Sequence, residues 1–229
     1  MSKPMKQGNL IFDRLPMGVW ESWQKKIEFV ELQLGQVVFD VGAPIRHVYF
    51  PSTAIISMTH LLLEGESIEV AMIGAEGVLG MSALMGDTKS SVRSLVLKSG
   101  GAYRVPANWM KREFEESSAV MQVMLRFSQN LMMQISQIAA CNSHHSLEQR
   151  LSRWLMLYAD RVKDRHIMCT QELIAHTLGV RRERLARVAG ALKKQGMIDY
   201  SRGTILLVNK EALKKNTCEC YRAIKLSYN

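Results

Sequence analysis

Short hydrophobic runs, separated by turn residues about every ten positions, fill the chain between residues 29 and 105. Several runs alternate between apolar and polar residues, as strands with one buried face do. Many short strands of this kind favour an all-β sandwich or barrel over a parallel sheet. The predicted strands are 29–34, 37–39, 47–50, 54–63, 68–73, 92–97 and 102–105. A short helix within residues 9–27, with Val19, Trp20, Trp23 and Ile27 on its apolar face, precedes them.

The periodicity changes at Ser117, and residues 117–142 contain neither glycine nor proline. Hydrophobic residues recur there every three or four positions, which is typical of one face of an α-helix. With a rise of 1.5 Å per residue, this helix is about 39 Å long, too long for a local cap on a small barrel. Its apolar face must be buried either against the barrel or against a second copy of the helix. The face consists of Val120, Met124, Phe127, Leu131, Ile135 and Ile138.

The segment from Gln171 to Gly190 has the spacing of a helix-turn-helix. Thr170 is placed to cap the first helix, and Ala175 is small where a second helix would cross it. Gly179 falls in the turn, where a left-handed backbone is required. A capping box over residues 146–149 opens an earlier helix. After the helix-turn-helix, residues 196–208 form a hairpin, or wing, and a final helix covers about 210–225.

Four arginines and one glutamate occupy the outward side of the second helix. Guanidinium groups bind phosphates and guanine edges, and a carboxylate accepts from the cytosine amino group. The alternative is an ordinary helical hairpin with a solvated basic face. A helix-turn-helix generally gains a palindromic target by dimerising, so we favour burial of the 117–142 helix against its own copy. The predicted DNA-binding residues are Arg181, Arg182, Glu183, Arg184 and Arg187, with Thr170 before the first helix and Arg202 in the wing.

The net charge of the chain lies entirely in its last third. Residues 146–229 contain 17 Lys and Arg against 8 Asp and Glu, whereas residues 1–145 contain 13 of each. Such a surface attracts any nucleic acid, whatever its sequence. No apolar run approaches the roughly 20 residues of a membrane span, and the N-terminus lacks the pattern of a signal peptide. We therefore expect a cytoplasmic protein that does not contact a membrane.

The four cysteines, Cys141, Cys169, Cys218 and Cys220, include no CxxC pair. On one helix Cys218 and Cys220 would point about 200° apart and could not share a tetrahedral metal ion. The pair His144-His145 fits a helix junction better than a ligand role. We therefore expect structural thiols, no metal and no cofactor, while a redox-sensitive thiol stays open.

The order of these parts resembles the Crp/Fnr family of bacterial transcription regulators. The resemblance is strongest in TQELIAHTLGVRRERLARVAGALKKQGMIDYSRG and is supported by LGQVVFDVGAPIRHVYFPSTAIIS and LEQRLSRWLMLYADR. It implies an α+β protein with an N-terminal antiparallel β-roll of the jelly-roll, cyclic-nucleotide-binding-like type. A long dimerisation helix and a C-terminal winged helix-turn-helix would follow. The corresponding domains are 1–116, 117–145 and 146–229.

Members of the family that bind cyclic AMP carry an Arg-Glu pair on the recognition helix and a second arginine four residues after the glutamate. By resemblance these roles fall on Arg182, Glu183 and Arg187, which would contact two guanines and a cytosine. Arg181 and Arg184 replace the small residues usual at their positions, so the target sequence is expected to differ.

The β-roll departs from the cyclic-nucleotide sensors of the family. Those sensors use a Gly-Glu-Leu sequence for the ribose and an arginine for the phosphate, and here Met81 and Ser91 stand at the two charged positions. Arg93 lies two residues further along a strand, about 7 Å away. A buried phosphate would lack its charge partner, so cyclic AMP is not the expected effector. The candidate pocket is Leu79, Gly80, Met81, Ser82, Ser91 and Val92, and both an uncharged ligand and an empty, packed roll stay open.

These observations favour a homodimeric, sequence-specific transcription regulator. The alternative is an architectural protein that binds nucleic acid without sequence preference and uses its β-roll only to dimerise. Glu183 favours the first interpretation, because a helix that only binds phosphates gains nothing from a carboxylate. An enzyme is not expected, since no nucleophile–base pair, paired carboxylates or glycine-rich phosphate loop can be assembled. The expected partners are double-stranded DNA with a two-fold symmetric operator, a second copy of the chain, and RNA polymerase.

Overall fold

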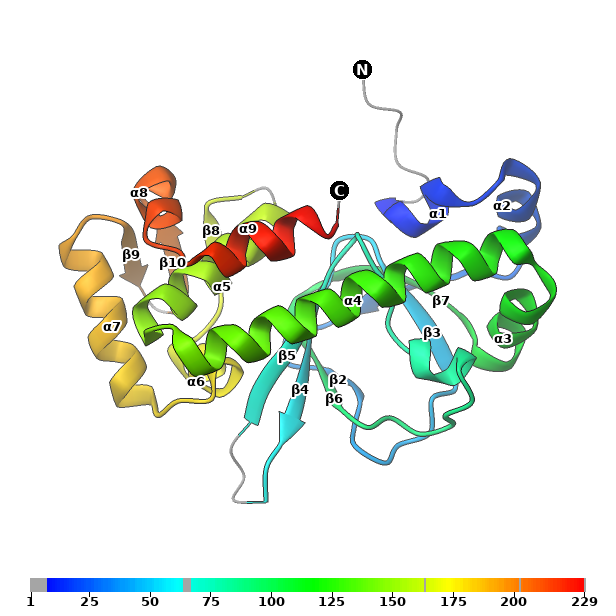
Figure 1. The fold of residues 1–229 in the computed structure, drawn as a ribbon, viewed down its shortest axis with the longest axis horizontal. Helices are drawn as coiled ribbons and strands as arrows, with labels where there is room; N and C mark the ends of the chain where they lie inside the picture. Colours follow the sequence, from blue (N-terminus) through cyan, green and yellow to red (C-terminus); the bar gives the residue numbers. More distant parts are fainter. Residues whose placement is uncertain (1–7, 64–66, 163, 202, 229) are drawn as a thin grey trace. The chain divides into compact units, whose positions relative to one another are not determined.

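The computed structural model describes residues 8–63, 67–162, 164–201 and 203–228, and Figure 1 shows its helices and strands. The chain divides into two compact units. The first comprises Met1–Met58 and Met72–Leu131, and the second comprises Thr59–Ala71 and Met132–Asn229.

Two sheets contain the seven strands predicted before residue 107. β1 (Glu28–Leu32), β7 (Gly100–Pro106) and β3 (His47–Pro51) form an antiparallel sheet in the order β1-β7-β3. β2 (Val37–Phe39), β6 (Arg93–Lys98), β4 (Ile55–Leu61) and β5 (Ser67–Ile73) form the other sheet in the order β2-β6-β4-β5. The antiparallel β-roll is thereby confirmed.

The helices of the first unit differ from the prediction at two places. The helix expected within residues 9–27 is two helices, α1 (Leu10–Arg14) and α2 (Met17–Trp23), and Ile27 lies outside both. The break falls at Leu15, whose backbone is extended (φ −75°, ψ 141°) because a residue before proline avoids the helical conformation. α3 (Ala107–Glu116) was not predicted, whereas α4 (Ser118–His144) matches the predicted long helix.

The core of the first unit includes residues from both sheets, from the helices before and after them, and from the start of α4. Val120, Met124 and Phe127 of α4 are at most 1% exposed within the single chain. A Cβ atom on Gly77 would lie 2.5 Å from Cε2 of Phe127, so the ring rests directly on this backbone. Val120, Met124 and Phe127 are therefore covered within the single chain and do not face a second copy, whereas a role of Leu131, Ile135 and Ile138 in dimerisation stays a prediction. The core residues include Phe12, Trp23, Phe50, Ile56, Val96, Val105, Met110, Val120, Met124 and Phe127.

The second unit is built around α5 (Leu147–Val162), whose residues from Leu151 to Ala159 are all buried. Its predicted capping box is present: the backbone N–H of Ser146 donates to Oε1 of Gln149 at 3.1 Å, and that of Gln149 donates to Oγ of Ser146 at 3.3 Å. The other elements are β8 (His166–Met168), α6 (Gln171–Leu178), α7 (Arg182–Lys194), β9 (Ile198–Ser201), β10 (Thr204–Leu207), α8 (Lys210–Lys215) and α9 (Glu219–Leu226). β9 and β10 form the predicted wing, and β8 completes the sheet in the order β8-β10-β9.

The predicted final helix is also divided, into α8 and α9. Nδ2 of Asn216 donates to Glu148 and Ser152 of α5 at 3.2 and 3.0 Å, which holds the end of α8 in place. Cys218 then adopts an extended backbone (φ −79°, ψ 169°) as the N-cap of α9. Cys218 and Cys220 therefore do not lie on one continuous helix. The expectation that their side chains point about 200° apart, which assumed one helix, does not apply.

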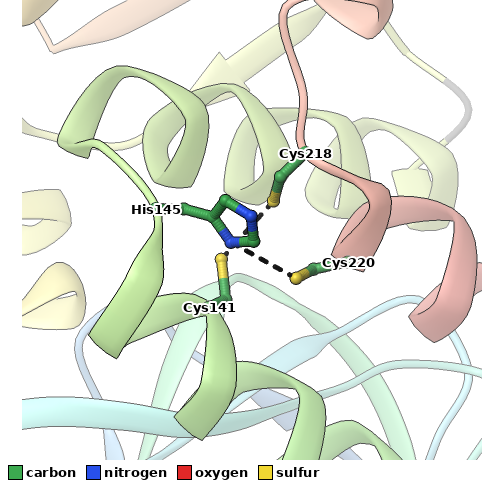
Figure 2. A group of neighbouring side chains, drawn as sticks. All are labelled: Cys141, His145, Cys218 and Cys220. Atoms are coloured by element: carbon green, nitrogen blue, oxygen red, sulfur yellow. Dashed lines mark hydrogen bonds between the residues drawn. The ribbon is translucent and has the colours of Figure 1, made fainter.

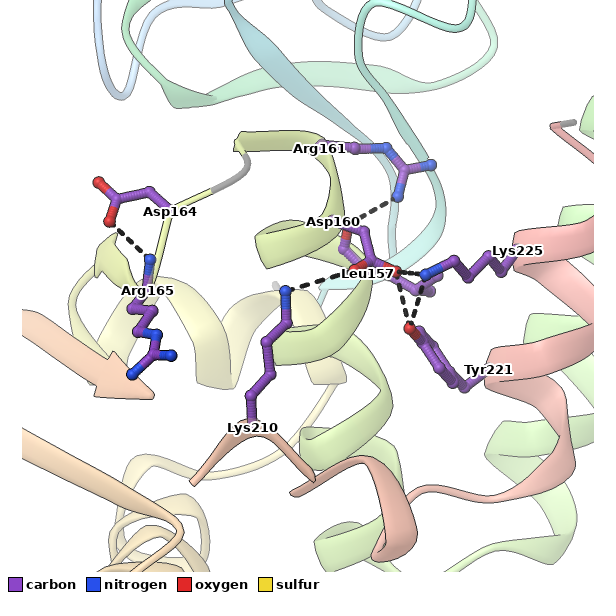
Figure 3. A network of polar contacts seen from close by, with 8 residues as sticks. All are labelled: Leu157, Asp160, Arg161, Asp164, Arg165, Lys210, Tyr221 and Lys225. Carbon is purple, nitrogen blue, oxygen red and sulfur yellow. Dashed lines mark hydrogen bonds and ion pairs between the residues drawn. The ribbon is translucent and has the colours of Figure 1, made fainter. Parts of the chain in front are cut away.

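Asp160 of α5 connects that helix to both α8 and α9 (Figure 3). Its carboxylate accepts hydrogen bonds from Nζ of Lys225 and from the hydroxyl of Tyr221, both at 2.7 Å, and Nζ of Lys210 lies 3.5 Å away. Burial by itself would raise the pKa of Asp160, but the hydrogen bonds from Lys225 and Tyr221 outweigh it and leave the pKa below its usual value.

Candidate nucleic-acid interface

The turn between α6 and α7 has the expected helix-turn-helix geometry. Oγ1 of Thr170 accepts from the backbone N–H of Leu173 at 3.2 Å and so caps α6. Gly179 ends the helix in the left-handed conformation (φ 63°, ψ 47°), and the N–H of Val180 donates to the carbonyl of Ala175 at 3.0 Å. A Cβ atom on Gly179 would also lie 3.2 Å from Cδ1 of Ile68. Both the backbone conformation and the neighbouring side chain therefore require glycine here.

The outward side of α7 is basic and solvent-exposed. At about 100° per residue, Glu183, Arg187 and Lys194 lie opposite the buried residues Leu185, Ala189 and Leu192. Arg184 lies about 80° from this line and Arg182 about 120° from it, in the exposed first turn, and Arg181 precedes the helix as its N-cap. All four predicted arginines of this region are exposed.

The arginines of α7 are available to a ligand. In the part of the chain that the structure describes, no ion pair engages Arg181, Arg182, Arg184 or Arg187. A concavity of about 510 Å³ lies beside them, lined by Gly179, Val180, Arg181, Glu183, Arg184 and Arg187. Guanidinium groups without an internal carboxylate partner can form bidentate hydrogen bonds to phosphates or guanine edges.

Two further residues of this face were not singled out from the sequence. Lys194 extends the basic line by about two helical turns beyond Arg187. Gly190 lies between them on the same face, and a Cβ atom there would meet nothing within 4 Å. A helical wheel drawn on the segment would have identified both.

The wing packs against the start of α6. The hydroxyl of Tyr200 in β9 accepts from the backbone N–H of Gln171 at 3.2 Å. Gly203 follows the turn with φ 84°. Arg202, the predicted wing contact, lies outside the described residues. The hydroxyl of Thr170 is engaged in capping, so a DNA contact by this residue stays a prediction.

The candidate effector pocket of the β-roll is closely packed. Leu79 and Met81 are buried in the core of the first unit, and Val92 is buried as well. Gly80 has φ 98°, and a Cβ atom there would lie 3.3 Å from the carbonyl oxygen of His47. Ser82 is half-buried and Ser91 exposed.

Arg93 does not offer its guanidinium to a ligand in this arrangement. Its Nε and Nη2 donate to the two carboxylate oxygens of Asp40 at 3.0 and 2.8 Å. The hydrogen bond from Arg93 also lowers the pKa of Asp40, which keeps the carboxylate charged. The cation named from the sequence as a possible replacement for the phosphate arginine is thus paired with an aspartate.

A second face of α4 is apolar and at least partly exposed. Its residues alternate at spacings of four and three, the 3.5-residue repeat of a coiled coil. Leu125 and Met132 are 47% and 55% exposed. Arg126 is the one Lys, Arg, Asp or Glu between Ser118 and His144. We refer to this face as the outer seam; it consists of Met121, Leu125, Ser128, Met132, Ile135 and Ala139.

The fold also gathers three cysteines and a histidine that the sequence separates. Cys141, His145, Cys218 and Cys220 lie together in the second unit, whereas Cys169 is buried elsewhere in that unit. The hydrogen bond between Cys141 and Cys218 lowers the pKa of Cys218 to about 5 and raises that of Cys141. Burial raises the pKa of Cys169 to about 12, which disfavours its reactive thiolate form.

Comparisons with known proteins agree with this architecture. Residues 149–215 match the model of the Crp-like helix-turn-helix domain. The global nitrogen regulator of Synechococcus elongatus is 20% identical over 199 residues, which cover 82% of this chain and 89% of that protein. A Crp/Fnr-family structure from Eubacterium rectale shares the fold with a TM-score of 0.74 and 16% identity, over 92% of this chain and 99% of the other. FixK2 from Bradyrhizobium japonicum gives a TM-score of 0.71 and 14% identity, over 84% and 98%.

Residues 149–215 therefore form a Crp-like helix-turn-helix domain, and the chain shares its fold, a β-roll followed by a long helix and the helix-turn-helix, with structures of Crp/Fnr regulators. This agrees with the Crp/Fnr resemblance in the sequence, at the level of the helix-turn-helix domain and of the fold. None of the described helices combines the length and the apolar content needed to cross a lipid bilayer.

Proposed function

We propose that this protein is a homodimeric regulator that binds a two-fold symmetric DNA operator through α7 and does not respond to cyclic AMP. The proposal depends above all on one observation. Four exposed arginines surround Glu183 at the start of α7, and no ion pair among the described residues occupies them. The three parts of the chain, 1–116, 117–145 and 146–229, would then serve as sensor, dimer helix and DNA-binding domain.

Specific binding requires both signs of charge on α7. Arg187 and Glu183 lie on the outermost line of the helix, where side chains reach base edges in the major groove. Arg181, Arg184 and Lys194 are placed to bind phosphates, which fixes the protein on the duplex without selecting a sequence. Gly190 leaves open space in the middle of this face, so the helix backbone can approach the groove closely.

Dimerisation is assigned to the outer seam of α4. Val120, Met124 and Phe127 of the face first predicted for it lie in the core of the first unit, whereas the outer seam, which shares Ile135 with that face, is apolar, partly exposed and almost free of charge. Interfaces between protein chains are depleted of charged residues at their centre in the same way. Two copies of α4 packed along this seam would place two recognition helices on adjacent half-sites, about one helical turn of DNA apart.

The packed pocket supports the proposal that cyclic AMP is not the effector. Met81 contributes no charge, and Arg93 is bound to Asp40 in a bidentate pair. A cyclic nucleotide would have to bury its phosphate without a cation, which is strongly unfavourable. Binding to RNA polymerase at promoters remains part of the proposal and is independent of the pocket.

The DNA assignment is tested by fluorescence anisotropy with a duplex selected from random sequences and a scrambled duplex at the same salt concentration. Arg187→Ala and Arg182→Ala should each lose about 1–3 kcal/mol on the selected duplex and much less on the scrambled one. Arg112→Ala, which removes the same charge from α3, is the control and should change neither. Glu183→Gln should relax the preference at one base pair. Equal losses on both duplexes would support the architectural alternative instead.

The seam is tested by light scattering. Leu125→Glu and Met132→Glu place like charges opposite each other in the dimer and should give folded monomers with weak operator binding. Gln122→Glu adds the same charge to α4, about 100° away from the seam, and should leave the dimer intact. Dimers in both seam variants would refute the assignment.

A further inference from the structure

Four potential metal ligands converge from two distant segments of the second unit (Figure 2). Cys141 and His145 come from the end of α4 and the residue after it, and Cys218 and Cys220 come from the start of α9. The sulfur atoms of Cys141 and Cys218 are 3.5 Å apart, and Nδ1 of His145 is 3.6 Å from the sulfur of Cys220. All four ligand atoms lie within 4.8 Å of one another.

The local backbone explains how the four side chains meet. Cys141 and His145 are four residues apart, and the N–H of His145 donates to the carbonyl of Cys141 at 3.1 Å, which continues the helical turn. Residues four apart on a helix lie on the same face. Cys218 is extended and precedes α9, whereas Cys220 is in its first turn. This change of conformation between them lets both sulfur atoms face the same point.

The spacing of the ligand atoms fits a single tetrahedral ion. Zinc bonds of about 2.3 Å to sulfur and about 2.0–2.1 Å to nitrogen place tetrahedral ligand atoms about 3.5–3.8 Å apart. The distances of 3.5 and 3.6 Å match this separation, and the remaining pairs of ligand atoms lie within 4.8 Å. Thiolates that hold an iron–sulfur cluster bind different iron atoms and stand farther apart. The geometry therefore favours one ion over a cluster.

Neighbouring side chains orient the ligands as they do around metals in proteins. Nε2 of His145 lies 3.3 Å from Oε1 of Glu219, so the other ring nitrogen faces the three sulfur atoms. Nε2 of Gln137 donates to the sulfur of Cys220 at 3.1 Å. A carboxylate behind a ligating histidine and a donor on a thiolate are the usual outer partners of such a site.

A buried positive charge near the cluster is a second, independent indication that a negatively charged metal–thiolate centre belongs there. Arg153 of α5 is 2% exposed, and its Nε and Nη1 have no hydrogen-bond partner among the described residues. Its charge acts directly on Cys141. A buried guanidinium needs a nearby negative charge. Three thiolates and one zinc ion carry a net charge of −1, which would supply it.

We propose that Cys141, His145, Cys218 and Cys220 form a structural zinc site that fastens α9 to the end of α4. Zn²⁺ binds the three sulfur atoms as thiolates and Nδ1 of neutral His145, and the protons of the three thiols pass to solvent. The four protein ligands fill the coordination sphere, so the site is structural rather than catalytic. The metal would stabilise the second unit, because an unfolded chain does not hold these ligands together.

The first experiment measures zinc in the full-length protein, purified under reducing conditions with zinc in the growth medium. Plasma mass spectrometry should find about one zinc per chain. Cys220→Ser and His145→Ala should lose it, whereas Cys169→Ser, which removes the cysteine outside the cluster, should keep it. A wild-type protein without stoichiometric zinc, or a Cys220→Ser variant that retains all of it, would overturn the proposal.

The second experiment uses variants that leave the fold intact. Metal is first removed from the wild-type protein with a chelator. The protein is then titrated with zinc in the presence of a chromophoric competitor, which gives the zinc affinity. A parallel titration with Co²⁺ reports tetrahedral thiolate ligation through its visible spectrum. Glu219→Gln changes an exposed side chain and should weaken zinc binding about 10- to 100-fold. Unchanged affinity in this variant, or a cobalt spectrum without tetrahedral bands, would count against the site. The protein could instead take up no zinc after reduction and form a Cys141–Cys218 disulfide on reoxidation. That outcome would overturn the metal site and identify the two cysteines as a redox pair.

Discussion

Asp160 provides the most direct test of what holds α8 and α9 on the DNA-binding domain. Asp160→Asn removes the charge but keeps an oxygen that can accept from Tyr221. The loss is then mainly the attraction to Lys225 at 2.7 Å and to Lys210 at 3.5 Å. A charge-assisted hydrogen bond contributes about 1.5–3 kcal/mol. Because the Lys225 side chain is 48% exposed, we expect the substitution to destabilise the protein by about 1–2 kcal/mol at pH 7.

The pH dependence of this loss follows from the lowered pKa of Asp160. A carboxyl group whose pKa is lower in the folded state stabilises the protein above its unfolded pKa, and the contribution disappears as the pH falls through the folded value. The difference in the free energy of unfolding between wild type and Asp160→Asn should therefore be largest at pH 7 and decrease below about pH 4.

Urea unfolding followed by circular dichroism at pH 7 and pH 3.5 measures both quantities. Glu211→Gln neutralises an exposed carboxylate of α8 and serves as the control, with little change expected at either pH. Hydrogen exchange at pH 7 should place the lost protection in α8 and α9. An equal loss for Asp160→Asn at both pH values would show that packing, rather than the ion pairs, holds these helices.

Three further outcomes follow from the structure. Gly179→Ala forces a left-handed alanine against Ile68 and should cost at least about 1–2 kcal/mol of stability, measured by urea unfolding; a neutral result would mean that the turn can rearrange. Gly190→Ala adds a methyl group in open space on the surface of α7 and should stabilise the protein by up to about 1 kcal/mol in the same assay. A loss of stability would reveal a contact that the single chain does not make. Calorimetric titration with cyclic AMP should give no saturable heat up to millimolar ligand, and a micromolar dissociation constant would show that Arg93 leaves Asp40 to bind the phosphate.

The hydrophobic pattern was sufficient to predict the strands and the helix-turn-helix. Alternating runs and turn residues located all seven strands of the roll, and Thr170 and Gly179 marked the ends of α6 because capping and the left-handed turn are local requirements. The single helices expected over 9–27 and 210–225 were wrong for reasons outside the local pattern. The first is broken by the extended residue before Pro16. The second is broken where Asn216 bonds to α5, a contact between residues more than sixty positions apart.

The two apolar faces of α4 show a limit of periodicity. A hydrophobic pattern predicts that a face is covered but not what covers it, and the first half of the more regular face, from Val120 to Phe127, is covered by the core of the first unit. The outer seam is less hydrophobic, since Ser128 and Ala139 belong to it, and it became visible only when exposure was known. The thiol cluster was missed for a related reason, because spacing along the chain says little about ligands that come from two segments.

The outer seam and the core-facing side of α4 share one helix, so their relative phase is fixed by the number of residues between them. Inserting one residue near Ser128 would turn every later side chain by about 100°, and Met132, Ile135 and Ala139 would leave the line started by Met121 and Leu125. Seven residues make almost two full turns, so an insertion or deletion of that length would nearly restore both faces. The length of α4 is therefore expected to vary between related regulators in steps of seven, even where the side chains along it vary freely.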